Sequence, residues 1–427
     1  MQIHVVRPGQ SLFGIAQAYN TTESELIRAN ELSAPGNLVV GQALVIPIVG
    51  RYVFVQPGDS LYTIARRFGM SAAELARINR IPLTQPLQVG TRLYVPPRPR
   101  RRGEFNAYVE PIGNVVTPAL RQSTRNAAPH LTYLAPFSFQ INRDGTLAPP
   151  NLDDFASIAG QNGVTMMLVV TNIEGGQFST ELAHVILTDE ALQDRLLDNI
   201  MATARRLGFR DIHFDIERVD PADREAYNRF LRKAADRIHA AGYLISTALA
   251  PKTSAEQRGE WYTAHDYRAH GQIADFVVIM TYEWGYSGGP PMPVSPIGPV
   301  RRVLEYAISE IPAEKIMMGQ NLYGYVWTLP YRRGTTARAI SPQTAIDIAR
   351  RENVAIQYDD RAQAPFFNYV DDAGRQHRVW FEDARSIQAK FDLVKELGLR
   401  GVSYWKLGLS FPQNWLLIED NFDVVKR

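Results

Sequence analysis

From Glu104 to the C-terminus, short apolar runs alternate with longer segments in which apolar residues recur every three to four positions. Short runs of this kind are typical of strands buried in a parallel sheet, and the longer segments are typical of amphipathic helices. The runs predict eight strands: Asn106–Pro111, Thr132–Phe137, Thr165–Thr171, Asp211–Glu217, Tyr243–Leu249, Phe276–Tyr282, Lys315–Tyr323 and Gly401–Trp405. The clearest helices are expected at Ala191–Leu207, Pro221–Ala241 and Arg385–Leu397.

Eight strands with helices between them indicate an α/β fold, in which residues 104–427 form a (β/α)8 TIM barrel. Such barrels usually have about 250 residues, so this region is longer than the barrel alone requires. The largest excess lies between the seventh and eighth strands, at about residues 328–383, and has strand and helix signals of its own. We expect it to form a small α+β insertion beside the mouth of the barrel.

The fourth predicted strand has an unusual pattern, because polar and apolar residues alternate strictly along it. Its polar face carries four titratable side chains: Asp211, His213, Asp215 and Glu217. Strands of a parallel sheet between helices are normally apolar on both faces, and burying titratable groups costs free energy unless they are paired or used. Glu217 comes last, at the carboxyl end, where barrel enzymes keep their catalytic groups. The pattern favours a catalytic strand, with a purely structural ladder of buried ion pairs as the alternative.

The first hundred residues follow a different pattern, a repeat without gaps at an offset of 49 positions. Pro8–Leu12 matches Pro57–Leu61, and the correspondences continue to the end of each copy. Each copy has a short strand, a Pro-Gly turn, two short helices and a closing strand. The repeat therefore predicts two βααβ units, at residues 1–48 and 50–97.

These units carry the pattern V-x-PGxSLxxIA, followed by ELxxxN and GxxL, which resembles the LysM module. The resemblance implies binding of N-acetylglucosamine chains, in peptidoglycan or chitin, between the Pro-Gly loop and the loop after the second helix. It assigns ten candidate glycan-binding residues to these two loops: Gly9, Gln10, Ser11, Leu12, Asn30, Gly58, Asp59, Ser60, Leu61 and Asn79. For the leucines and asparagines, a structural role in the core or in holding a loop is the alternative.

The end of the fourth strand resembles the DxxDxDxE signature of family 18 glycoside hydrolases. Asp215 and Glu217 match its last two acids, whereas His213 stands in place of the middle aspartate and Arg210 in place of the first. This family is an exception to catalysis by a pair of carboxylates, because the substrate supplies the nucleophile. The resemblance implies that Glu217 protonates the glycosidic oxygen while the 2-acetamido group attacks the anomeric carbon, and then activates water with net retention.

Two further strand ends support this resemblance. The sixth continues into Met280-Thr281-Tyr282-Glu283-Trp284, similar to the family's Met-x-Tyr-Asp, and the eighth ends in a tryptophan similar to the family's floor. The resemblance implies that Asp215 orients the acetamide N–H and that Tyr282 binds its carbonyl, which makes both catalytic beside Glu217. It assigns substrate contacts to Trp405, His213, Met280, Trp284, Tyr323 and Tyr404. For Trp284 and Tyr323, packing in the barrel core is the alternative.

Composition and charge narrow the possible chemistry. The sequence has no cysteine, and its 8 histidines form no cluster with metal-ligand spacing, so we expect no metal and no other cofactor. Residues 1–103 carry twelve arginines, no lysine and five acidic residues, which suggests an anionic polymer as partner. The LysM resemblance explains this charge better than nucleic acid does. Residues 98–103, rich in proline and arginine, are expected to form a semi-rigid linker.

These observations predict a monomeric peptidoglycan hydrolase of the N-acetylglucosaminidase type, whose paired modules bind the wall. Two LysM units before a family 18 domain resemble the cortex-lytic glucosaminidases of spore-forming bacteria, which implies the spore or the cell wall as location. Residues 1–9 lack the pattern of a signal peptide and no apolar run reaches the length of a membrane span, so we expect neither feature. A chitinase and a non-catalytic glycan-binding coat protein are the alternatives. We also expect removal of residues 1–98 to weaken wall binding but to spare the hydrolysis of small substrates.

Overall fold

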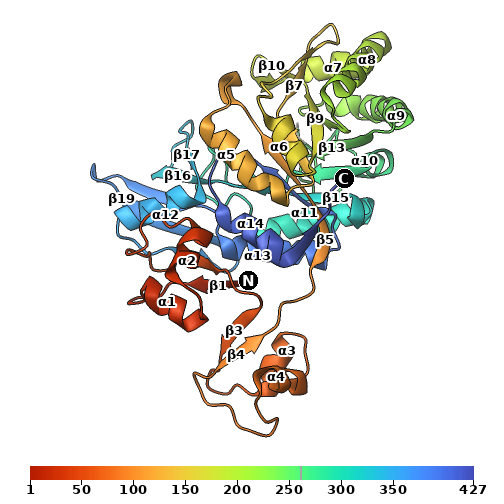
Figure 1. Ribbon diagram of the computed structural model, residues 1–427. Coiled ribbons are helices and arrows are strands. Elements are labelled where there is room, and N and C mark those ends of the chain that lie inside the picture. The colour runs from red at the N-terminus through yellow and green to blue at the C-terminus, as the bar shows by residue number, and fades with distance from the viewer. Residues whose placement is uncertain (260–261) are drawn as a thin grey trace.

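Eight parallel strands form a closed ring in the computed structural model, which describes residues 1–259 and 262–427. They are β5 (Arg101–Val109), β6 (Tyr133–Pro136), β9 (Thr165–Thr171), β12 (Asp211–Asp215), β13 (Leu244–Leu249), β14 (Phe276–Ile279), β15 (Ile316–Asn321) and β21 (Gly401–Trp405). Each pairs in parallel with the next, and β21 pairs with β5 to close the ring. The predicted barrel is confirmed (Figure 1).

Helices cover the outside of the ring because their apolar stripes pack against the outward faces of the strands. They are α5 (Pro118–Ala127), α6 (Phe155–Gln161), α7 (Thr180–Thr188), α8 (Glu190–Leu207), α9 (Arg224–Ala240), α10 (Tyr267–Ile273), α11 (Ile297–Glu310), α13 (Ala384–Glu396) and α14 (Pro412–Asn421). All three predicted helices are present, two of them within one residue of the predicted bounds. The third opens with a 3-10 turn at Pro221–Asp223, capped by the Asp220 side chain, so α9 itself starts at Arg224.

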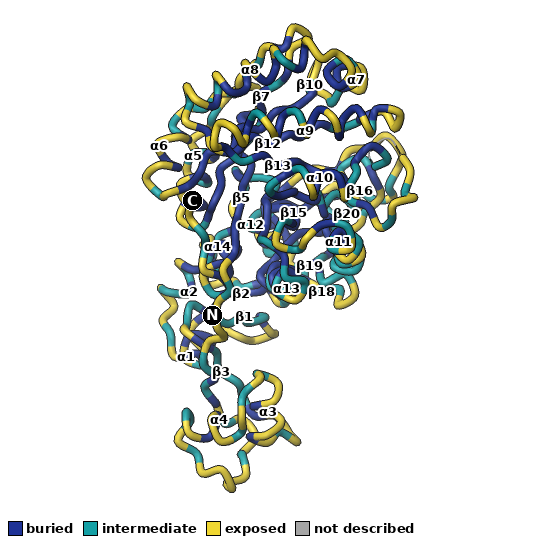
Figure 2. Tube along the Cα trace, turned by 90° about the vertical axis from the view of Figure 1, so that its right-hand side faces the viewer, coloured by how far each residue is buried: buried dark blue, intermediate teal, exposed yellow. Residues whose placement is uncertain are grey.

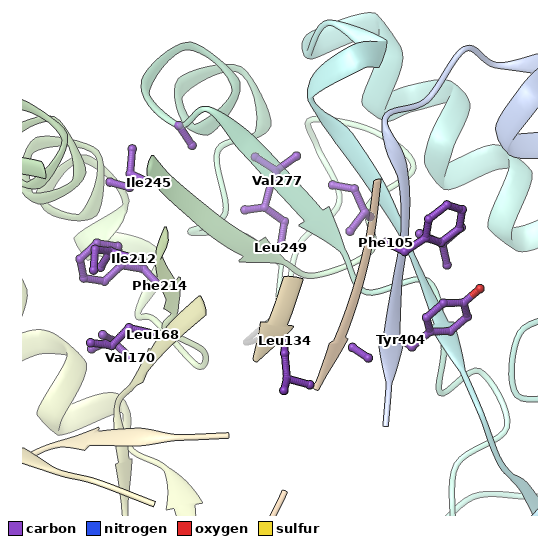
Figure 3. Packing of buried hydrophobic residues seen from close by; sticks show 14 of the residues in the cluster. Phe105, Leu134, Leu168, Val170, Ile212, Phe214, Ile245, Leu249, Val277 and Tyr404 are labelled. Carbon is purple, nitrogen blue, oxygen red and sulfur yellow. The ribbon is translucent and has the colours of Figure 1, made fainter. Parts of the chain in front are cut away.

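The strands separate two cores. Outside the ring, Ile212 and Phe214 of β12 point towards the helices and join one large apolar cluster (Figure 3). Inside it, aromatic and sulfur-containing side chains such as Tyr133, Met167 and Phe276 fill the lumen. Figure 2 shows the ring as a buried trace, so polar side chains that point inward from it are shielded from water.

The predicted insertion is a separate antiparallel sheet with one helix on it. Its elements are β16 (Gly324–Leu329), β17 (Arg338–Ile340), α12 (Pro342–Arg351), β18 (Gln357–Asp359), β19 (Ala364–Val370) and β20 (Gln376–Trp380). The strand order is β17-β16-β20-β19-β18. The insertion begins at residue 324, slightly before the predicted position, because β15 ends at Asn321 and the chain turns at once into β16.

The two N-terminal units have the predicted βααβ plan. The first contains β1 (Gln2–Val5), α1 (Leu12–Tyr19), α2 (Glu23–Asn30) and β2 (Ala43–Ile46), and the second contains β3 (Arg51–Phe54), α3 (Leu61–Arg67), α4 (Ala72–Asn79) and β4 (Arg92–Val95). Ser11 and Ser60 cap α1 and α3, each accepting a backbone N–H at 3.1 Å. We call the units module 1 and module 2.

Module 1 is docked on the barrel, whereas module 2 projects away from it (Figures 1 and 2). Val39 of module 1 lies in the core of the insertion, and Ala43 and Val45 lie in the large core of the barrel. The core of module 2 consists of its own residues. Module 1 therefore shares its apolar packing with the barrel and the insertion.

The linker is shorter than the predicted 98–103. Strand β5 already begins at Arg101, because the backbone of residues 101–103 pairs in parallel with β22 (Phe422–Val424) at the end of the chain.

Short strands form hairpins in the loops of the barrel: β7 (Phe139–Ile141) with β8 (Leu147–Ala148), and β10 (Ile173–Glu174) with β11 (Gln177–Phe178). No helix among the described residues is long and apolar enough to cross a membrane.

Candidate active site

The polar face of β12 points into the lumen and ends at the mouth of the barrel. Asp211 and His213 are fully buried, Asp215 is the last residue of the strand, and Glu217 follows it and is half-buried. Parallel barrel strands all end at the same rim, which is where catalytic groups gather. The structure therefore brings the two predicted catalytic acids together at this rim.

Asp215 and Glu217 form a pair of coupled acids. Burial raises the pKa of the Asp215 carboxyl to about 7. Burial, and next the charge of Asp215, hold the pKa of Glu217 well above its ordinary value, while the Arg218 guanidinium opposes this shift. Asp215 therefore loses its proton before Glu217 does, and the ionised Asp215 then favours the protonated form of Glu217. A protonated carboxyl beside a carboxylate is the arrangement that a general acid needs.

The backbone of Glu217 is held by Asn172, which directly follows β9. The Asn172 Oδ1 accepts the Glu217 N–H at 3.0 Å, and its Nδ2 donates to the Glu217 carbonyl at 2.8 Å and to the Ser179 carbonyl at 3.0 Å. Sequence reasoning missed this residue, although a lone amide directly after an apolar barrel strand was a signal for it.

A second side chain holds the residue before Glu217. The Nδ1 of His265 accepts the Ala250 N–H at 2.9 Å, so its Nε2 carries the proton and donates to the Ile216 carbonyl at 3.1 Å. Burial lowers the pKa of His265 to about 4, which keeps the ring neutral. Glu217 is thus fixed from the strands on both sides of β12, by groups that the local sequence around it does not reveal.

His213 lies in a chain of hydrogen bonds below the acid pair. The Tyr108 hydroxyl meets its Nε2 at 2.8 Å, its Nδ1 meets the Ser246 Oγ at 2.8 Å, and Ser246 donates to the Asp211 Oδ1 at 2.6 Å. Burial lowers the pKa of His213 to about 3 and raises the pKa of Asp211 to about 8. His213 is fully buried with both ring nitrogens engaged, so the expectation that it contacts substrate is wrong.

Arg210 lies at the opposite end of β12, just before the strand begins. Its guanidinium stacks over the Tyr243 ring, 5.4 Å from the ring centroid. The residue in place of the family's first aspartate is therefore far from the mouth of the barrel, and it contributes to packing there.

Aromatic side chains from three strand ends surround the acids. Tyr282, Tyr323 and Trp405 belong to one apolar cluster, in which Tyr282 and Trp405 are partly exposed. Trp405 also makes edge contacts with Tyr108 and with Phe137, at ring distances of 5.5 and 4.8 Å. Sequence reasoning missed Phe137, because nothing in the run that ends β6 distinguishes a cleft residue from a core residue. The cluster places apolar side chains beside the acids at the barrel mouth.

Gly319 makes room for Tyr282. A Cβ at this position would lie 2.8 Å from the Tyr282 ring and 2.5 Å from the Ile279 carbonyl oxygen, closer than such contacts occur. Burial, followed by the neighbouring Tyr108 and acid charges, raises the pKa of Tyr282, so its hydroxyl stays protonated. It can therefore donate a hydrogen bond to a substrate oxygen.

Glu283 ties the ends of the sixth and seventh strands together. Its carboxylate accepts hydrogen bonds from the Tyr323 hydroxyl and, at 3.1 Å, from the Tyr325 hydroxyl. Burial raises the pKa of Glu283, and the two tyrosine donors oppose this shift. Tyr323 is therefore fixed as a wall of the cleft next to Tyr282.

Three of the predicted substrate contacts lie elsewhere or at the margin. Tyr404 is fully buried on the outside of the barrel against Trp415 of α14, because neighbouring residues of a strand point to opposite faces (Figure 3). The expectation that Tyr404 contacts substrate is therefore wrong. Trp284 packs against the outer core and not against the cleft cluster. Met280 is half-buried just beyond β14, on the lumen side set by the alternation of Phe276 and Val278.

The ten predicted glycan contacts fall into two groups, each with members in both modules. Leu12 and Leu61 are core residues of their modules. Asn30 and Asn79 each use their whole side-chain amide to tie the second helix to the closing strand, with hydrogen bonds of 2.6–3.0 Å to backbone groups. For these four, the structural alternative is correct. The other six lie in the exposed or half-exposed Pro-Gly loops: Gly9, Gln10, Ser11, Gly58, Asp59 and Ser60.

Among residues 1–259 and 262–427, no group of three or more His, Cys, Asp or Glu side chains is arranged to hold a metal ion.

Comparisons with known proteins agree with this geometry. Residues 109–409 match the model of the glycosyl hydrolases family 18, and residues 4–47 and 54–96 match the LysM domain. The cortical fragment-lytic enzyme of Bacillus subtilis (strain 168) is 65% identical, over 100% of this chain and 99% of that protein.

Solved structures of spore cortex-lytic enzymes named SleL are similar over the whole chain. The one from Bacillus megaterium QM B1551 has a TM-score of 0.93 at 55% identity and covers 100% of this chain and 99% of its own. The one from Bacillus cereus has a TM-score of 0.90 at 52% identity, with 100% and 98% covered. The chain therefore belongs to the family 18 glycoside hydrolases, as a two-LysM member that is a close homologue of the spore cortex-lytic enzymes.

Proposed function

We propose that the chain is an N-acetylglucosaminidase that cleaves peptidoglycan of the spore cortex by a retaining, substrate-assisted mechanism. The observation that carries this proposal is the pair of acids at the barrel mouth, in which burial and the charge of Asp215 raise the pKa of Glu217. Relatives that are similar over the full length of the chain are named for action on cortex fragments, which supports this substrate.

Each residue of the cleft has a role that its position supports. Glu217 protonates the glycosidic oxygen as the 2-acetamido carbonyl oxygen bonds to the anomeric carbon and the bond to the leaving sugar breaks. Asp215 accepts the acetamide N–H and stabilises the positive charge that develops, and the Tyr282 hydroxyl donates to the acetamide oxygen. Glu217 then takes a proton from the water that opens the oxazolinium ring, which restores the acid and retains the anomeric configuration. Trp405 forms the floor under the reacting sugar.

The same proposal assigns wall binding to the modules. The exposed Pro-Gly loops at residues 9–11 and 58–60 bind N-acetylglucosamine units, and two weak sites on one chain raise the effective concentration of the barrel at the wall. The enzyme acts as a monomer in the spore, on cortex peptidoglycan or its fragments.

Digestion of purified substrates tests the reaction. The protein is incubated with spore cortex, vegetative peptidoglycan and chitin oligomers, and new reducing ends are identified by mass spectrometry. We expect products from cortex that end in reducing N-acetylglucosamine. Cleavage of chitin alone would favour a chitinase and contradict the proposal. Glu217→Gln should lower kcat about 10³-fold while the thermal transition is kept, since general acid–base groups contribute about 10²–10⁴-fold.

The pH dependence of kcat/KM tests the proton arrangement. The pKa of Asp215 is raised, so its active ionised form is lost as the pH falls through about 7. The pKa of Glu217 is raised further by the charge of Asp215, so its active protonated form is lost only at higher pH. We expect a bell-shaped profile with its acidic limb near pH 7. In Asp215→Asn the acidic limb should vanish and the alkaline limb should move to lower pH; an unmoved alkaline limb would contradict the coupling.

A further inference from the structure

A groove runs between module 1 and the barrel, outside the cleft described above. It has a volume of about 770 Å³, within the range of roughly 300–1,000 Å³ in which small ligands bind. One wall is α2 of module 1, the other is α5 of the barrel, and the floor is the start of α14 with the loop before it. We call it the module–barrel groove.

The groove is connected to the active site through the loop that follows β21. This loop starts directly after Trp405, and its residue Leu409 lies in the lining of the groove. Leu409 also packs against the apolar cluster that contains Trp405, Tyr282 and Tyr323. Leu409 is therefore shared between the lining of the groove and the apolar cluster at the barrel mouth.

The α2 wall of the groove is fixed to the floor of the groove and to the insertion. The Gln343 Nε2 donates to the Asn30 carbonyl at 2.7 Å, and the Gln413 Nε2 donates to the Asn30 Oδ1 at 2.8 Å and to the Ala43 carbonyl at 2.9 Å. At the edge of the groove, the Ser410 hydroxyl donates to Glu31 at 2.7 Å. The groove is thus formed before any ligand arrives, which lowers the entropic cost of binding.

The lining combines an apolar floor with polar walls. Phe411, Pro412 and Leu416 form the floor. On α5, the exposed Gln122 Nε2 donates to the Asn126 Oδ1 at 2.8 Å, and among the described residues the other polar atom of each amide makes no further hydrogen bond.

Glu25 and Arg28 line the groove on the α2 side, where the Glu25 Oε2 accepts from Thr21 and Thr22 in the cap of α2 and leaves the Oε1 as the acceptor. Amides, carboxylates and a guanidinium offer both donors and acceptors, which hydroxyl and acetamido groups of a sugar require, while the floor accepts the apolar face of a sugar ring.

We infer that the module–barrel groove binds the part of the N-acetylglucosamine-containing strand that lies beyond the sugars held in the catalytic cleft. This inference rests on the proposed function and adds to it a strand-binding site shared by module 1 and the barrel. It makes module 1 part of the substrate-binding surface of the enzyme, in addition to any binding by its own Pro-Gly loop. Long strands are then better substrates than short ones, because only they reach from Trp405 to α2.

A chain-length experiment on the full-length protein tests this site. Soluble cortex glycan fragments are separated by length, and kcat/KM is measured for each. Ala119 is exposed on the α5 wall, so Ala119→Trp fills the groove without disturbing a core. We expect it to lower the ratio of kcat/KM for long to short fragments about tenfold, and Gln122→Ala with Asn126→Ala to lower it about threefold. Ala202→Trp, at an exposed position of α8 away from the groove, is the matched control and should leave the ratio unchanged.

Hydrogen exchange gives a second measurement that does not depend on turnover. The inactive Glu217→Gln protein is mixed with the longest fragments, and protection is expected in peptides covering residues 119–126 and 408–412. Protection that spares these peptides, or an unchanged ratio in Ala119→Trp, would overturn the inference. If the wild-type protein cleaves none of the fragments, the proposed function fails, while the exchange data still decide whether the groove binds them.

Discussion

The two modules share one sequence plan, yet one is built into the enzyme and the other is not. Positions that specify the βααβ fold are the same in both copies, such as Leu12 and Leu61 or Asn30 and Asn79. The positions that dock module 1 differ between the copies. They are Val39, Ala43 and Val45 in module 1, where the matching residues of module 2 are Gln88, Arg92 and Tyr94.

The difference shows how two copies of one repeat can have different functions. Apolar residues on the outside of a small module are tolerated in module 1 because the barrel and its insertion cover them, whereas Gln88 and Arg92 remain exposed. Module 1 is fixed against the barrel and forms part of the module–barrel groove. The other kept both sides of its own Pro-Gly loop accessible.

Removal of whole modules should give the largest contrast. Without residues 1–48, the surfaces that Val39, Ala43 and Val45 cover become exposed, so we expect aggregation or a fall of about 10 °C or more in the barrel's thermal transition. Excision of 51–96 should leave the barrel intact, because paired Arg51 and Val95 bring the two ends together. Thermal scans with activity on short fragments decide this. An active barrel without residues 1–48 would restore the view that both modules are dispensable.

A matched pair of glycines sharpens the comparison at single-residue level. Gly41 and Gly90 hold equivalent turns with φ of +84° and +86°. A side chain strains the backbone at either position by about 1–2 kcal/mol. At Gly41 its Cβ would also lie 1.8 Å from the Ile356 carbonyl oxygen, whereas at Gly90 nothing lies within 4 Å.

We therefore expect Gly41→Val to lower the melting temperature of the barrel by several degrees, since overpacking adds about 1–3 kcal/mol. Gly90→Val should weaken only module 2. Differential scanning calorimetry separates the two transitions. Equal effects of the two substitutions on the barrel transition would show that the docking of module 1 contributes little to its stability.

Equivalent exposed aromatics give the smallest expected effect, on wall binding. Phe13 and Tyr62 follow the Pro-Gly loops and are 60% and 64% exposed. In module 1 the loop after the second helix is engaged at Asn30 by Gln343 of the insertion, whereas in module 2 residues 58–60 and 79–81 are all exposed or half-exposed. In cosedimentation with insoluble peptidoglycan, Tyr62→Ala should weaken binding about fivefold, or about 1 kcal/mol, and Phe13→Ala about twofold or less. The control is Val49→Ala, at an exposed residue between the modules. A larger loss from Phe13→Ala would reverse the assignment.

The part of the active site that lies on a single strand could be predicted from the sequence. The alternation along 211–217 placed Asp215 and Glu217 on the lumen face, and their order placed Glu217 at the rim. The same rule of alternation argues against Tyr404, because Trp405 points inward and its neighbour must then point outward. The groups that hold the backbone at Glu217 come from elsewhere in the chain: Asn172 directly follows β9, and His265 lies in the segment before α10, where no local pattern marks it.

By itself the sequence determined the elements of this protein, their order, the two repeats, and the face of β12 that carries the chemistry. These depend on periodicity, which is a property of residues close together in the chain. The tertiary structure decided the rest: that His213 is sealed in a neutral hydrogen-bonded chain, that Asn30 is a structural residue, and that module 1 belongs to the barrel. The reason is physical, because burial, pKa and docking depend on which distant residues are brought into contact, and a one-dimensional pattern does not contain that information.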